Sequence, residues 1–213
     1  GDMAESEEIN FNVPEDNFLG AVAKWDNYDT ADGLADIIRG ANLIKKKGLQ
    51  RPQYAIMEQS MFDHLCAQKK TIKRVASAIL KATGLDSADD VTLESVNSYM
   101  RRKSAPQILV VDPYVVIEGK DGKKTTVQPW NVNSVVLSPE ARLGYTYYKT
   151  VPRVPNSNAL QEYGSYYKLT VYSELNPMLE VTMTEAYIQP ALSNRRSLVF
   201  INAMHTEWNG GEA

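Results

Sequence analysis

The chain has 213 residues, a formal net charge of −3 and a single cysteine. This length can bury one large core or two modest ones, and the acidic balance argues against a protein that grips nucleic acid by neutralising phosphates. Because Cys66 stands alone, it can form neither an intrachain disulfide nor a multi-cysteine metal cage. No apolar run approaches the roughly 20 residues that a membrane helix needs, so we expect no membrane partner.

The first half of the chain predicts mostly helices. Residues 1–20 are acidic and show little periodicity, which predicts a frayed or docked arm. The clearest helix is predicted over residues 30–47, where apolar residues recur at helical spacing. We expect Asp29 or Thr30 to cap this helix and Gly48 to end it in a left-handed conformation. A strand over 53–58 should follow, and then helices over 60–69, over 71–83 and from Thr92 onward.

The second half predicts strands. Asp121-Gly122 is typical of a tight hairpin turn between two of them. Helices come first and strands afterwards, and this order favours an α+β fold over regularly alternating βαβ units. The expected strands cover residues 107–112, 114–118, 123–128, 133–138, 166–174, 180–188 and 197–203.

The sequence offers little catalytic chemistry. It has two histidines, His64 and His205, and lacks the HExxH, GxSxG, phosphate-loop and dinucleotide-binding patterns. His64 and Cys66 lie two apart on a predicted helix and so face different directions, which leaves a nucleophile pair conceivable only across the fold. The simpler interpretation is a partly buried histidine and a core thiol. We predict no catalytic residue, cofactor or metal.

Tyrosines crowd one region of the predicted β half. They could stack on bases or sugars, line a protein interface, where tyrosine gives a large contact area, or fill ordinary strand packing. The acidic balance weakens the nucleic-acid option and leaves interface and core both open. The residues concerned are Tyr145, Tyr147, Tyr148, Tyr163, Tyr166, Tyr167 and Tyr172.

Five pieces of the sequence, in order, resemble the major capsid proteins of tailed phages, and most closely the lambda-type head protein family. Gly33 and Gln53 stand where that family more often has proline and asparagine. The first two pieces are Trp25-Asp26, Ala31-Asp32 and Ala35-Asp36-Ile37 leading to Gly48, then Pro52-Gln53-Tyr54-Ala55-Ile56-Met57. The others are Pro129-Trp130 with Val135-Val136-Leu137-Ser138-Pro139 and Leu143-Gly144, then Tyr172-Ser173 with Asn176-Pro177, and Tyr187-Ile188-Gln189-Pro190 with residues 198–203.

The resemblance implies an HK97-like capsid fold. In that fold a spine helix packs on a sheet in a peripheral domain, and a mixed α/β axial domain lies near the centre of the capsomer. Residues 25–52 and 186–213 would form the peripheral domain, with the helix at 30–47 as its spine across the closing strand at 197–203. Residues 53–185 would form the axial domain, and residues 1–24 a poorly ordered remnant of an arm.

The resemblance also implies a structural role without catalysis: self-assembly into pentamers, hexamers and an icosahedral shell that encloses DNA. Partners would be copies of the chain and scaffolding, portal or decoration proteins, without sequence-specific nucleic-acid binding. The expected location is the virion capsid, and the bacterial host cytoplasm during assembly. The candidate subunit-interface residues are Arg101, Arg102, Tyr145, Tyr147, Tyr148 and Tyr166.

Two other classes of function stay open. A secreted or surface binding module would use the tyrosine-rich β half, and a small enzyme would use His64 and Cys66. In the capsid family an N-terminal arm and an extended hairpin loop precede the spine helix, whereas this sequence begins almost at that helix. We therefore expect a part of a longer protein, which by itself would be a monomer or a weak oligomer.

Overall fold

A computed structural model describes residues 10–83, 91–112, 114–119, 122–149, 159–165, 167–175 and 178–208. The chain divides into two compact units, one made of residues up to Arg142 and from Asn194 onward, the other of Leu143–Ser193. The described residues contain four α-helices and several small sheets, so the fold is a mixture of helices and mainly antiparallel strands, as the α+β prediction requires. Among the described helices, none is long and apolar enough to cross a membrane.

The first unit is built on a five-stranded sheet with the strand order β1-β12-β6-β2-β3. β1 runs parallel to β12 and β2 parallel to β3, while β6 is antiparallel to both of its neighbours. The strands are β1 (Phe18–Gly20), β2 (Tyr54–Glu58), β3 (Gln107–Val111), β6 (Ser134–Ser138) and β12 (Val199–Asn202).

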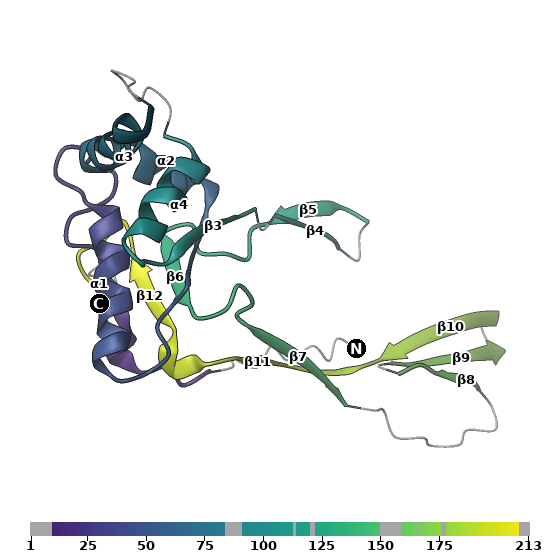
Figure 1. The fold of residues 1–213 in the computed structure, drawn as a ribbon. Helices are drawn as coiled ribbons and strands as arrows, with labels where there is room; N and C mark the ends of the chain where they lie inside the picture. Colours follow the sequence, from purple (N-terminus) through teal and green to yellow (C-terminus); the bar gives the residue numbers. More distant parts are fainter. Residues whose placement is uncertain are drawn as a thin grey trace. The chain divides into compact units, whose positions relative to one another are not determined.

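Helix α1 (Gly33–Lys46) packs on this sheet against β12 and β6, and Figure 1 shows it lying alongside β12. Its apolar stripe is fully buried: Leu34, Ile37, Ala41 and Ile44 have no exposed surface. Gly40 lets the helix come close, since a Cβ there would lie 2.6 Å from Leu137 Cδ1 on β6. The helix predicted over residues 30–47, and its packing against the strand at 199–202, are therefore confirmed.

The ends of α1 differ partly from the prediction. Asp32 is the N-cap, and its carboxylate accepts a hydrogen bond from the backbone N–H of Ala35 at 3.1 Å. The expected caps, Asp29 and Thr30, lie before the helix. At the other end Gly48 has φ +70°, the left-handed conformation expected there.

Three further helices complete the first unit: α2 (Gln59–Ala67), α3 (Lys69–Thr83) and α4 (Leu93–Arg102). α2 contacts β2 and β3, and α3 contacts both α2 and α4. Thr92 caps α4, as predicted, through a reciprocal pair of hydrogen bonds with Ser95. A hairpin of β4 (Val115–Glu118) and β5 (Lys124–Val127) stands away from the central sheet (Figure 1).

The second unit consists of strands. β7 (Gly144–Lys149) pairs with β11 (Tyr187–Leu192) as a two-stranded ribbon. β8 (Leu160–Tyr163), β9 (Lys168–Leu175) and β10 (Met178–Glu185) form a three-stranded sheet. The sequence predicted one strand over 180–188, but the chain changes partners at Ala186, from β9 to β7. It did not predict β1, β7 or β8.

Residues 15–24 are not a loose arm. β1 extends the central sheet, and just before it the side-chain amide of Asn17 donates to the backbone oxygens of Arg196 at 3.0 Å and Leu198 at 2.8 Å. β2, β3 and β6, which the sequence assigned to an axial domain over 53–185, share one sheet with β12.

Candidate assembly surfaces

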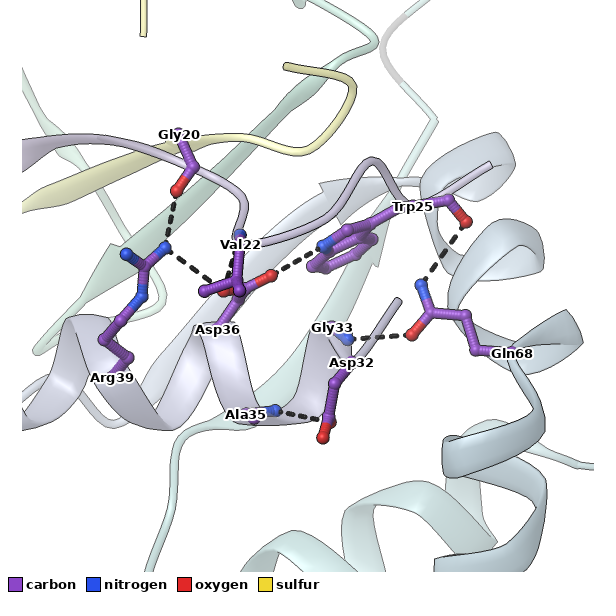
Figure 2. Close-up of polar contacts among 9 residues, drawn as sticks. All are labelled: Gly20, Val22, Trp25, Asp32, Gly33, Ala35, Asp36, Arg39 and Gln68. Carbon is purple, nitrogen blue, oxygen red and sulfur yellow. Dashed lines mark hydrogen bonds and ion pairs between the residues drawn. The ribbon is translucent and has the colours of Figure 1, made fainter. Parts of the chain in front are cut away.

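A buried carboxylate binds the segment before α1 to the helix (Figure 2). Asp36 accepts hydrogen bonds from the indole N–H of Trp25 and the backbone N–H of Val22, both at 3.2 Å, and pairs with Arg39 at 3.1 Å. Arg39 also donates to the backbone oxygen of Gly20 at 2.5 Å. Burial nevertheless raises the pKa of Asp36, because desolvation outweighs these favourable partners. The sequence did not reveal this role of Asp36.

A second set of polar contacts joins the start of α1 to the following helices. The side-chain oxygen of Gln68, which is fully buried, accepts from the backbone N–H of Gly33 at 2.8 Å (Figure 2). Arg74 on α3 holds both carboxylate oxygens of Asp32 at 2.5 and 2.6 Å. These contacts fix α1 relative to α2 and α3 within the first unit.

The β7–β11 ribbon carries large apolar and aromatic side chains on both of its faces. Residues directly opposite each other in an antiparallel pair share a face. The register therefore places Tyr145, Tyr147 and Tyr187 on one face, and Tyr148 with Ile188 on the other. All five are exposed; Tyr147 keeps 61% of its surface and Ile188 58%. A two-stranded ribbon has no core of its own, so a stable ribbon needs a covering surface.

The β4–β5 hairpin has the same character. Val115 pairs with Val127, and Ile117 lies on the same face two residues along. Val116 points to the opposite face and keeps 61% of its surface, while Ile117 keeps 53%. Contiguous apolar side chains of this kind on a folded chain mark interaction sites.

The predicted interface residues are found in separate places. Tyr145, Tyr147 and Tyr148 lie together on β7 and are exposed, and Tyr166 lies outside the described residues. Arg101 and Arg102 are exposed in the last turn of α4, in the other unit. The guanidinium of Arg102 donates to the backbone oxygen of Ala78 on α3 at 3.0 Å. Arg102 therefore has a role within its own chain.

The structure gives His64 a partner other than Cys66. His64 Nδ1 lies 3.0 Å from the hydroxyl of Tyr28. Burial, with a smaller contribution from the Asp63 carboxylate, raises the pKa of Cys66 to about 11. An attacking thiol needs a lowered pKa, because the thiolate is the reactive form. Within the described part of the chain, no group of acidic, histidine or cysteine side chains could hold a metal ion.

Comparison with known proteins finds a similarity in fold but none in sequence. None of the protein-family models matches the chain, and no curated protein is similar to it in sequence. The fold is similar to that of a phage-related protein from Bordetella bronchiseptica RB50, with a TM-score of 0.50 and 18% identity over 93% of this chain. The match covers 58% of that protein, so this chain spans little more than half its length.

Proposed function

We propose that this chain is the body of a structural subunit of a phage or prophage shell, a major capsid protein of the HK97-like fold. The main support is the β7–β11 ribbon, whose two faces both expose tyrosine or isoleucine. A subunit in a shell contacts neighbouring subunits on several sides. An exposed ribbon of this kind would therefore become buried only when identical copies surround the subunit.

Two further observations support this proposal. α1 lies across β12 and β6, the arrangement that a spine helix on a sheet requires. The structurally similar protein from Bordetella bronchiseptica is itself described as phage-related. In the proposed role the subunit forms pentamers and hexamers without catalysis. It works in the host cytoplasm during assembly and in the virion afterwards, with scaffolding, portal or decoration proteins as further partners.

Imaging the full-length gene product tests the proposal. We expect shells or capsomers on the order of tens of nanometres across by electron microscopy, held together by many modest contacts acting at once. Strictly monomeric protein at high concentration would argue against a shell subunit.

The ribbon provides the sharper experiment. Tyr147→Ser with Ile188→Ser removes one large side chain from each face, and we expect assembled particles to be lost while the monomer keeps its circular dichroism spectrum. Val22→Ser is the matched control, because its side chain is 71% exposed and lies outside the ribbon. Particles formed equally well by the ribbon variant and the control would mean that the ribbon is no interface.

The tyrosines also support a second candidate, a surface module that binds sugars or another protein through its aromatic face. Exposed Tyr145, Tyr147 and Tyr187 on one face are the relevant observation. Such a module would bind its ligand as a monomer. An enzyme acting through Cys66 is disfavoured by the raised pKa of its thiol.

A further inference from the structure

A groove in the first unit, with a volume of about 1060 Å³, is lined by positive charge from three helices. Its described lining includes no acidic residue. Arg39 and Arg74 are paired with aspartates, but the described carboxylates form no ion pair with Lys45, Lys46 or Lys103, all three of which are exposed. Like charges facing one groove repel each other, so the groove favours an occupant that carries negative charge.

The groove also has an apolar part, formed by Ile38 and Leu43 of α1 and by Tyr99 of α4. All three side chains are half-buried. A phosphate backbone would match only the charge of such a surface, whereas a protein surface with acidic and apolar side chains matches both parts. The groove therefore suits a protein partner.

One face of the three-stranded sheet β8–β9–β10 in the second unit has the matching character (Figure 1). Residues directly opposite each other in antiparallel strands share a face. The register therefore places two glutamates and three aliphatic side chains on one face, with serine and threonine as its other described members and no lysine or arginine among them. The acids are Glu162 and Glu180, and the aliphatic residues are Leu160, Leu169 and Val171.

The chain leaves this acidic face open to solvent. Leu160 keeps 75% of its surface, and Glu162 and Glu180 are exposed. On the other face of the same sheet, Lys168 and Thr170 are buried. Neither glutamate forms an ion pair with a described lysine or arginine. The groove and the acidic face therefore carry opposite charges, and both expose them.

We propose that the groove of one molecule binds the acidic face of a second copy. Opposite charges would bring the two surfaces together in one orientation, and the aliphatic side chains of the face would meet the apolar part of the groove. Because the two surfaces are different patches of the same chain, the contact is heterologous, and its repetition gives a ring or a filament. The inference rests on the proposed shell role, in which identical copies assemble.

Light scattering of the 213-residue chain tests the contact. A parent carrying Tyr147→Ser and Ile188→Ser keeps the ribbon from contributing. At about 0.01 M salt, where charges act over about 30 Å, its apparent mass should rise with concentration. Association should fall several-fold at about 1 M salt, where charges are screened within about 3 Å.

Two further variants of this parent remove one surface each. The groove variant carries Lys45→Ser with Lys46→Ser, the face variant carries Glu162→Gln with Glu180→Gln, and each should stay monomeric by itself. An equimolar mixture contains one intact groove and one intact face, so it should form complexes of two molecules and nothing larger.

Control variants lose the same charges elsewhere on the surface. Lys24→Ser with Lys124→Ser, and Asp112→Asn with Glu118→Gln, change exposed residues outside the groove and the acidic face. Both controls should associate as the parent does.

Three results would each overturn the proposed contact: a parent that stays monomeric at low salt, a groove variant that associates as strongly as the parent, or a mixture without two-molecule complexes. Shells built by full-length protein that carries the groove substitutions would overturn this contact and leave the proposed function intact.

Discussion

At the scale of single residues, Asp36 contributes most to the order of the chain before α1. Its carboxylate is 1% exposed and accepts from Trp25, Val22 and Arg39. A buried carboxylate is costly unless hydrogen bonds replace its water. The three donors come from a side chain, a loop amide and the next turn of the helix. They therefore tie the incoming segment to α1 at one point.

The raised pKa of Asp36 predicts a pH dependence. The folded protein keeps this proton to a higher pH than the unfolded chain, in which the aspartate pKa has its ordinary value of 3.8. As pH rises through the folded pKa, the unfolded state has already released the proton, and this residue's contribution to the free energy of unfolding falls. Urea denaturation from about pH 3.5 to about pH 7 should therefore show the wild type losing stability relative to Asp36→Asn. A difference that stays flat or grows with pH would contradict this.

At the scale of elements, the close approach of α1 to the sheet depends on Gly40. Glycine is normally unfavourable inside a helix by about 1 kcal/mol relative to alanine. Here a Cβ would also lie 3.3 Å from Val199 Cγ1, besides its contact with Leu137. The absence of a side chain therefore lets β6 and β12 pack directly on the helix.

Gly40→Val should therefore destabilise the protein by about 1–3 kcal/mol, because it overpacks a filled core. Thermal or urea unfolding would measure the change. Asn42→Val on the exposed side of the same helix is the control, with an expected change of a few tenths of a kcal/mol. Equal stability of the two variants would show that the helix can move away from the sheet without cost.

The elements that the sequence predicted best are those whose cause is local. α1 follows from helical spacing of Leu34, Ile37 and Ile44, and α4 from the cap at Thr92. The sequence did not predict β7, and it merged the start of β11 with β10 into one strand. Both errors arise because β7 and β11 pair across about 40 residues of chain, which no local pattern reveals. Nothing within Tyr187–Leu192 indicates that its partner differs from that of β10.

At the scale of the whole molecule, the chain combines a well-packed unit with exposed β elements. Trp25, Leu34, Met57 and Leu137 are fully buried in the first unit. The β4–β5 hairpin and the β7–β11 ribbon leave apolar side chains open on both faces. In the proposed shell role, these side chains become buried where copies of the chain meet.

We therefore expect this 213-residue chain to associate weakly with itself and not to build shells. Its apparent mass in light scattering should rise with concentration, since binding to further copies follows mass action. Closed shells formed by these residues alone would contradict this expectation. A mass independent of concentration would contradict the assembly role of the ribbon and the hairpin.

The amino-acid sequence alone was sufficient for the α+β class, the helix over Gly33–Lys46 and its left-handed stop at Gly48, because these depend on side-chain spacing and on glycine within a few residues. It also drew attention to the tyrosines, but left interface and core equally open. Only the tertiary structure shows that Tyr147 and Tyr148 are exposed on opposite faces of a ribbon, because strand register determines which face each side chain occupies. The pairing of Arg74 with Asp32 likewise exists only after folding, because it joins side chains that are 42 residues apart along the chain.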